Sequence, residues 1–393
     1  MPSGSKTRES SHMSSSLVLA HRPKTSKADS ANTGSSEKRR KITSSPTPTP
    51  TSHRSRHKSK SKSKSKSSTK HPQPAERVPS PLPPPAMPDF QEETASLTDS
   101  AKAFSYENGL RYHGYRPGSY SFPNDDTQQE IDRWAHVLSY NLCGKYFQSP
   151  VQSRLDKGAQ VLDLGTGTGT WFESLADSYP NTSFEGIDLS HIQSPEVPPN
   201  VQFYVDDMEH EQGWDFDGRK FDFIFIRNTI NSVRNRAELM RRAYDHLKPG
   251  GYFEVQDFDC APGCDDGTVP ENYALGSFFA YLAAGMDVRG SDLYGIRSVA
   301  AEMRAAGFKN VTDESRKCPI GEWAADQNRR FCGSLLSHCI LTGLPGLSAR
   351  PFAALGWTPT EIEVFLVSVR EHVKTTAFHA YLPYRTVFGR KPR

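Results

Sequence analysis

The chain has 393 residues and a net charge of +3, and all of its 41 aromatic residues lie at or beyond Phe90. Residues 1–89 hold 18 Lys or Arg and 5 Asp or Glu, whereas residues 90–393 hold 30 Lys or Arg and 40 Asp or Glu. A segment without aromatic residues cannot bury enough apolar surface to offset the entropy of ordering it, so we predict that residues 1–89 are disordered. No apolar run approaches the roughly 18–20 residues of a membrane helix, and Leu17–Ala20 is too short for a signal peptide. We therefore expect neither membrane insertion nor secretion.

Two features of this basic segment bear on localisation. Lys38–Lys41 (KRRK) is a compact cluster of the size that a nuclear import receptor binds, and Ser52–Lys70 alternates Ser with basic residues. We predict that the protein is nuclear, shuttling with the cytoplasm, and that an import receptor binds Lys38–Lys41; a solvated linker without a ligand is the alternative. Sequence-specific nucleic-acid binding is not expected, because a disordered segment offers no fold that reads bases.

Beyond Phe90, helix-like and strand-like segments alternate. The predicted helices are Gln128–Leu142, Trp171–Ser178 and Glu238–Leu247, and the predicted strands are Val161–Leu164, Ser183–Leu189, Val201–Val205, Phe221–Ile226 and Tyr252–Gln256. This alternation is typical of α/β proteins with a doubly wound, mostly parallel sheet.

The most informative motif is VLDLGTGTG, residues Val161–Gly169, in which a strand turns directly into three glycines. Glycines there let the backbone adopt positive φ and approach a ligand closely. Asp188 follows at the end of the next strand, the position from which a carboxylate accepts the ribose hydroxyls of an adenosine ligand. The motif therefore predicts an adenosine-containing ligand.

The loop excludes several nucleotides. It lacks both the G-x-G-x-x-G pattern of dinucleotide folds and the Gly-Lys-Ser/Thr of phosphate-binding loops. S-adenosylmethionine carries no phosphate and needs no Lys or Arg in the loop, so it is the predicted cofactor. Asp163 is expected to face its cationic amino-acid end, and Asp207 and Met208 to contact its adenine. No metal is predicted. Cys260 and Cys264 have a spacing that zinc could use, but no second pair of Cys or His residues follows them at the distance typical of a zinc site.

At these residues the sequence resembles the class I S-adenosylmethionine-dependent methyltransferases, and more narrowly the fungal LaeA-like methyltransferases. The resemblance lies in Glu107–Arg116, Pro123–Asp126, Val161–Gly169, Gly186–Leu189, Ile192–Gln193, Leu247–Glu254, Cys264–Thr268 and His379–Tyr381. It implies a Rossmann-like, seven-stranded sheet at residues 151–393, a helical cap at 90–150 and an insertion at about 258–297. It also implies regulation of secondary metabolism and development together with velvet-type regulatory proteins. The cofactor-binding residues that it implies are Asp163, Gly165, Gly167, Gly169, Asp188, Asp207 and Met208.

No catalytic residue is assigned, because methyl transfer needs a base only where the acceptor must lose a proton. The candidates at predicted strand ends are Arg227, Asn228, Glu254, Asp257 and Asp259, and the aromatic candidates for covering the sulfonium are Tyr106, Tyr112, His113 and Tyr115. A nucleic-acid base is not the expected acceptor, because the Asn/Asp-Pro-Pro-Tyr/Phe motif is absent after the fourth strand.

Three functions remain open at this point: a nuclear regulator, a biosynthetic enzyme that methylates a small metabolite, and a protein that binds the cofactor without turnover. For the second function, apolar residues of the insertion either line a metabolite pocket or belong to the core. These residues are Tyr273, Phe278, Phe279, Tyr281 and Met286.

Overall fold

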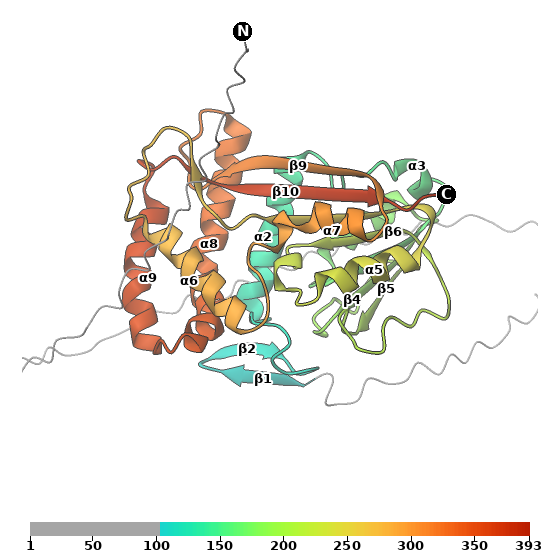
Figure 1. Cartoon of the computed structure of the whole chain (residues 1–393), viewed down its shortest axis with the longest axis horizontal. Coiled ribbons are helices and arrows are strands. Elements are labelled where there is room, and N and C mark those ends of the chain that lie inside the picture. Colours follow the sequence, from blue (N-terminus) through green and yellow to red (C-terminus); the bar gives the residue numbers. More distant parts are fainter. Residues whose placement is uncertain (1–102) are drawn as a thin grey trace, which may run out of the picture. The chain divides into compact units, whose positions relative to one another are not determined.

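The computed structural model describes residues 103–393 (Figure 1), so the predictions for residues 1–89 lie outside the described residues. The chain begins there with a hairpin of β1 (Phe104–Glu107) and β2 (Leu110–His113). Helix α2 (Asp126–Cys143) follows, with the Asp125 side chain accepting a hydrogen bond from the Gln128 N–H at its start. The segment expected as a helical cap thus contains a hairpin as well as a helix.

The central sheet has eight strands in the order β5-β4-β3-β6-β7-β10-β8, with β9 paired to β10. The strands are β3 (Gln160–Leu164), β4 (Ser183–Asp188), β5 (Val201–Val205), β6 (Phe221–Arg227), β7 (Leu247–Phe258), β8 (Gly263–Cys264), β9 (Lys309–Pro319) and β10 (Ala380–Arg390). Strands β3 to β7 pair in parallel, whereas β8 and β9 are antiparallel to β10, and β10 is antiparallel to β7. This confirms the predicted doubly wound sheet; the two-residue β8 brings the expected seven strands to eight.

Short helices and turns lie before, between and after the parallel strands. They are α3 (Gln152–Leu155), α4 (Thr170–Glu173), α5 (Arg236–His246) and α7 (Val299–Ala305), with the 3-10 turns η1 (Ala176–Ser178), η2 (Ile230–Ser232) and η3 (Gly295–Arg297). The single helix predicted over Trp171–Ser178 is therefore two pieces, α4 and η1.

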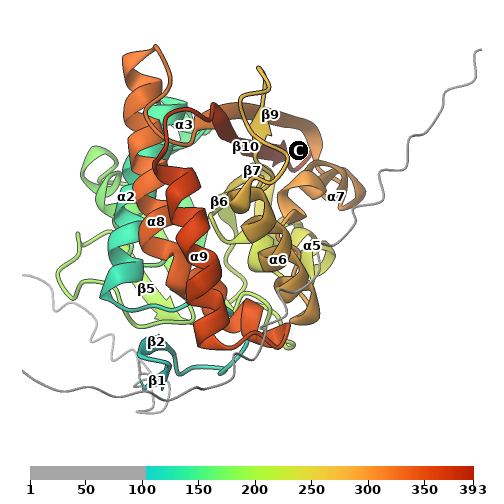
Figure 2. The ribbon, with the colours of Figure 1, turned by 90° about the vertical axis from the view of Figure 1, so that its left-hand side faces the viewer.

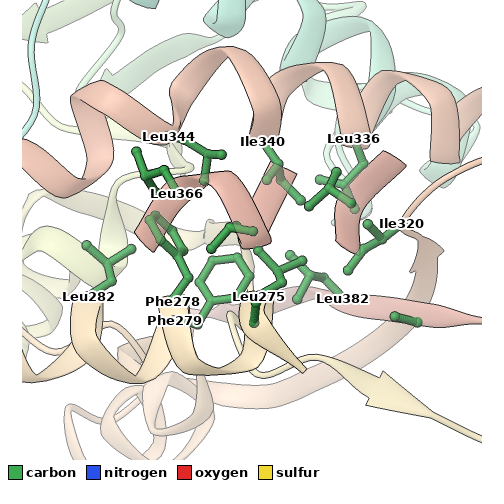
Figure 3. Packing of buried hydrophobic residues seen from close by; sticks show 14 of the residues in the cluster. Leu275, Phe278, Phe279, Leu282, Ile320, Leu336, Ile340, Leu344, Leu366 and Leu382 are labelled. Carbon is green, nitrogen blue, oxygen red and sulfur yellow. The ribbon is translucent and has the colours of Figure 1, made fainter. Parts of the chain in front are cut away.

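Three longer helices form a separate layer with α2 (Figure 2). Helix α6 (Ala274–Val288) belongs to the predicted insertion, whereas α8 (Gln327–Ala354) and α9 (Pro359–Lys374) form a second insertion, between β9 and β10, that the sequence analysis did not predict. Their apolar side chains interlock (Figure 3). Tyr273, Phe278, Phe279 and Met286 are buried in this cluster and Tyr281 packs against it, so these residues form core.

Helix α8 corrects the expectation that no segment is long and apolar enough to span a membrane. Its 28 residues satisfy both criteria, with a mean hydropathy of 1.2 over an 18-residue window. Half of that window is buried, and α8 packs against α2, α6 and α9. This is the environment of a core helix in the part of the chain that the structure describes.

Candidate functional site

A cavity lies at the carboxyl ends of the parallel strands, where open α/β sheets bind their ligands. Strand β3 ends at Leu164, β4 at Asp188 and β6 at Arg227, and the segment 113–132 closes the cavity from the other side. Six of the seven predicted cofactor-binding residues line this one cavity: Asp163, Gly165, Gly167, Asp188, Asp207 and Met208. Gly169, the seventh, is not among the lining residues.

The three glycines of the loop have different surroundings, although all have positive φ. A Cβ on Gly165 would lie 3.0 Å from Thr229 Oγ1, and a Cβ on Gly169 would lie 2.3 Å from Phe203 Cζ. A Cβ on Gly167 would meet only Asp132 Oδ2, at 3.8 Å. Gly169 therefore makes room for a packed phenyl ring, whereas Gly167 leaves its backbone open to the cavity.

Asp188 holds the loop and faces the cavity. Its Oδ2 accepts a hydrogen bond from the Gly167 N–H at 2.9 Å, and its Oδ1 accepts one from the Ser190 N–H at 2.8 Å. Burial raises the pKa of Asp188, and these two hydrogen bonds oppose that rise. A carboxylate fixed in this way at the end of β4 is suited to accept ribose hydroxyls.

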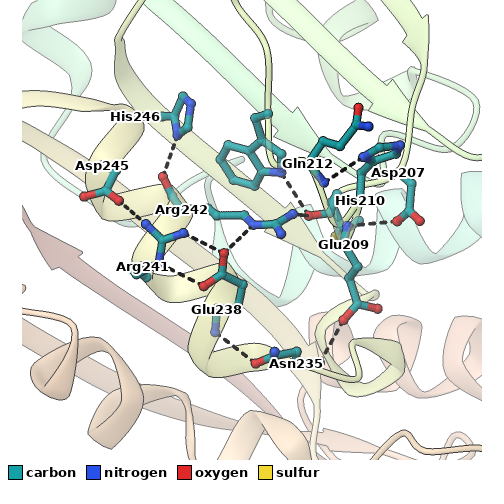
Figure 4. A network of polar contacts seen from close by, with 12 residues as sticks. Asp207, Glu209, His210, Gln212, Asn235, Glu238, Arg241, Arg242, Asp245 and His246 are labelled. Atoms are coloured by element: carbon teal, nitrogen blue, oxygen red, sulfur yellow. Dashed lines mark hydrogen bonds and ion pairs between the residues drawn. The ribbon is translucent and has the colours of Figure 1, made fainter.

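The loop that carries Asp207 and Met208 is anchored by helix α5 (Figure 4). The Met208 carbonyl accepts hydrogen bonds from Arg242 Nη1 at 3.0 Å and from Trp214 Nε1 at 2.9 Å. Asp207 lies 3.4 Å from Arg116 Nη1 in an ion pair, and its Oδ1 accepts a hydrogen bond from the Glu209 N–H. The loop is thus held on both sides while the two predicted adenine contacts line the cavity.

Of the four aromatic candidates, only His113 lines the cavity. Tyr106 is 72% exposed, and Tyr112 is buried beneath the Arg350 guanidinium. Tyr120, which the sequence analysis missed, also lines the cavity. Burial raises the pKa of Tyr120, so its phenol stays protonated and can donate a hydrogen bond but cannot act as a base.

The candidates at the strand ends separate into two groups. Arg227 and Asn228 line the cavity, and Asn228 adopts a φ of 55°. Glu254 is fully buried elsewhere and accepts hydrogen bonds from the N–H groups of Gln148 and Ser149. Asp259 is paired with Arg297, and Asp257, also outside the cavity lining, accepts a hydrogen bond from the Phe258 N–H. Glu254 and Asp259 therefore have structural roles, whereas Asp257 Oδ2 is buried without a hydrogen-bond partner within residues 103–393.

Asp132 on α2 is a further site residue that the sequence analysis missed. It lines the cavity, and the nearby Gln128 Nε2 donates a hydrogen bond to its Oδ1 at 2.9 Å. Gln128, Asp132 and His136 recur every four residues and so share one face of α2. This polar stripe was a usable signal, but the same pattern is typical of a helix face in solvent.

The cavity favours a cationic ligand. Burial raises the pKa of Asp163 to about 7 and that of Asp132 to about 6, and the positive charge of Arg227 opposes both rises. Among residues 103–393, Arg227 is the single Arg or Lys that lines this cavity, whereas six carboxylate residues line it: Asp132, Asp163, Asp188, Asp206, Asp207 and Glu209. The open backbone of Gly167, the fixed Asp188 and this acidic excess fit S-adenosylmethionine, which carries a ribose, an ammonium and a positively charged sulfur. Within residues 103–393, no group of three or more His, Cys, Asp or Glu side chains is arranged to hold a metal ion.

Comparisons with known proteins point to the same chemistry. Residues 131–313 match a family model described as a methyltransferase domain. Methyltransferase pytC of Aspergillus terreus is 34% identical over 307 residues, which cover 77% of this chain and 93% of that protein. The secondary metabolism regulator laeA of Aspergillus niger is 30% identical over 291 residues, 74% of this chain and 76% of the relative. The protein-methionine methyltransferase laeA of Emericella nidulans is 28% identical over 291 residues, which cover 74% of this chain and 77% of that protein.

Proposed function

This chain belongs to the fungal LaeA-like S-adenosylmethionine-dependent methyltransferases, and from that premise we propose that it acts in the nucleus as a regulator of secondary metabolism and development, together with velvet-type regulatory proteins. The cavity at the carboxyl ends of β3, β4 and β6 carries the enzymatic part of the proposal. Relatives named as regulators of secondary metabolism support the regulatory part.

The residues of the cavity have distinct roles in this proposal. The open backbone at Gly167 receives the cofactor, Asp188 holds its ribose, and Asp207 and Met208 contact its adenine. The bound cofactor supplies a methyl group on a positively charged sulfur. Tyr120, held protonated by burial, donates a hydrogen bond at the wall opposite the sheet and helps to exclude water.

We infer that the methyl acceptor is a side chain of a protein. A relative is named a protein-methionine methyltransferase, and a thioether has no proton to lose, so its methylation needs no base. Two observations agree with this: Glu254, Asp257 and Asp259 lie outside the cavity lining, and the apolar residues of α6 are buried in the core. Asp132 and Asp163, which do line the cavity, are assigned in this proposal to the cofactor and not to the acceptor. Methylation of a small metabolite is the second candidate, because the pytC relative has a higher identity than the laeA proteins and is named only as a methyltransferase.

The acceptor is tested with purified protein, methyl-labelled S-adenosylmethionine, a nuclear extract and a culture extract. Label on protein supports the proposal, and label in the organic-soluble fraction overturns it in favour of a metabolite. No label, with cofactor binding confirmed in parallel, favours a protein that binds the cofactor without turnover. An Asp188→Asn variant, which loses the carboxylate at the ribose, is the control for transfer at this site.

Nuclear import is tested in the fluorescently tagged full chain by changing Lys38–Lys41 to Ala. The matched control changes four lysines of the neighbouring tract, Lys58, Lys60, Lys62 and Lys64, to Ala, which removes as much positive charge. Import through the cluster predicts that only the first variant leaves the nucleus. Equal localisation of both variants contradicts it. Recovery of a velvet-type protein with the tagged chain from nuclear extract tests the partnership.

A further inference from the structure

The polar stripe of α2 lies over the glycine loop rather than in solvent. Gln128 and Asp132 line the cavity, and Asp132 Oδ2 is the atom that a Cβ on Gly167 would meet. Because Gln128 Nε2 donates to Asp132 Oδ1, the Asp132 carboxylate is held in one orientation and Oδ2 stays available. The third member of the stripe, His136, is buried and is not among the residues that line the cavity.

His136 connects α2 to Arg227. Its Nδ1 lies 3.0 Å from Arg227 Nη2, and its Nε2 lies 2.9 Å from Ser174 Oγ. Burial and the charge of Arg227 lower the pKa of His136 to about 3, so the imidazole is neutral. A guanidinium can only donate, so Nδ1 accepts from Arg227 and Nε2 carries the hydrogen toward Ser174. Ser174 Oγ in turn donates to the Thr170 carbonyl at 3.1 Å, which completes a directed chain of hydrogen bonds.

The sheet order places Arg227 at the end of the cavity opposite the adenine contacts. Strands β5, β4, β3 and β6 are neighbours in that order, with Asp207 beyond β5, Asp188 at the end of β4 and Arg227 at the end of β6. A ligand with its adenine at Asp207 and its ribose at Asp188 therefore presents its third part to Arg227. In S-adenosylmethionine that part is an α-amino acid.

The charges at this end complement an amino acid. Arg227, Asp132 and Asp163 all line the cavity, and the charge of Arg227 lowers the pKa of both carboxyl groups. His113 gives independent evidence that the cavity has room for polar ligand groups. It is 2% exposed, its Nδ1 lies 2.6 Å from the Tyr115 carbonyl, and its Nε2 has no partner within the described residues.

On the premise that this cavity binds S-adenosylmethionine, we propose that Asp132 and Arg227 form a clamp for the α-ammonium and α-carboxylate groups of its methionine part, with His136 as the positioning residue for Arg227. Asp132 accepts hydrogen bonds from the ammonium, and Arg227 donates to the carboxylate. The clamp uses the cap helix, so α2 completes the cofactor site as well as covering it.

The test compares two ligands by calorimetry on the full chain. S-adenosylhomocysteine contains the amino acid, whereas 5′-methylthioadenosine has the same adenosine and sulfur without it. Asp132→Asn and Arg227→Gln are expected to weaken S-adenosylhomocysteine binding by about 10- to 100-fold, the range for a hydrogen bond to a charged group, and to leave methylthioadenosine binding unchanged. His136→Phe, which keeps a ring against Tyr146 but removes the acceptor, is expected to give the same pattern with a smaller loss.

Two controls make the result specific. Glu130→Gln changes an exposed carboxylate on the same helix and should affect neither ligand, whereas Asp188→Asn should weaken both ligands alike. Asp132→Asn keeps its size and its bond from Gln128, so the test stands even where His136→Phe does not fold. Equal effects on the two ligands, or none on S-adenosylhomocysteine, would overturn the clamp. Failure of the unmodified protein to bind S-adenosylhomocysteine would instead overturn the assignment of the cavity.

Discussion

Replacing Gly167 with Ala separates the role of the glycine loop in ligand binding from its role in folding. Gly167 has a φ of +58°, so any other residue there adopts a left-handed conformation that costs about 1–2 kcal/mol. Gly213→Ala is a matched control: its φ is +84°, its Cβ would meet nothing within 4 Å, and it does not line the cavity. Both variants should therefore lose about 1–2 kcal/mol in free energy of unfolding, as measured by denaturant titration.

Only Gly167→Ala should lose affinity for the cofactor. The added methyl group would lie 3.8 Å from Asp132 Oδ2, which is already van der Waals contact, so it fills the gap between the loop and α2. A ligand that passes between them must move or be excluded, and we expect a loss of more than about tenfold, or 1.4 kcal/mol, by calorimetry with S-adenosylhomocysteine. Unchanged affinity in a Gly167→Ala protein that is as destabilised as the control would refute the assignment of this loop to the cofactor.

Three further predictions follow from the burial and charge of named groups. Phe278→Ala should lower the free energy of unfolding by about 3–5 kcal/mol without changing cofactor affinity, because the ring is core; a loss of affinity would place α6 in the site. Glu254→Gln should lower the melting temperature, because the buried carboxylate accepts several hydrogen bonds. The amide that replaces it leaves one donor unpaired, which costs about 1–3 kcal/mol in free energy of unfolding. An unchanged melting temperature would contradict this role. The pKa values of Asp132 and Asp163, about 6 and 7, lie above the ordinary 3.8, so both groups hold protons in the free protein only below these pH values. Their contribution to stability is therefore present in acid and is lost as pH rises through these values. A cationic cofactor favours the ionised forms of Asp132 and Asp163, so cofactor affinity should rise as pH increases through about 6 to 7, with release of protons on binding. Cofactor affinity that calorimetry finds independent of pH over this range would contradict this.

The parts of the fold that the sequence predicted are those with local signals. Val201–Val205 agrees with β5 at both ends, and β3, β4 and β6 lie within a residue or two of prediction, because short apolar runs next to glycine or charged residues mark buried parallel strands. The residues at the ends of these strands then meet at one edge of the sheet, which is why six predicted site residues share a cavity.

The missed parts depend on packing between distant segments. Helix α8 is buried against several neighbours and contains Pro345 and Pro351, so it has no single apolar face for a periodic pattern to reveal. Asp132 is polar at helical spacing, which looks the same whether the helix faces water or a ligand cavity. Only the arrangement of α2 over the glycine loop distinguishes the two cases.

The most direct measurement is a crystal structure of the protein with S-adenosylhomocysteine. The ribose is predicted against Asp188, the adenine beside Asp207 and Met208, and the amino acid between Asp132 and Arg227. Ligand density in this orientation would establish the cavity as the methyltransferase site. Ligand bound elsewhere, or with its amino acid at Asp207, would contradict the assignment.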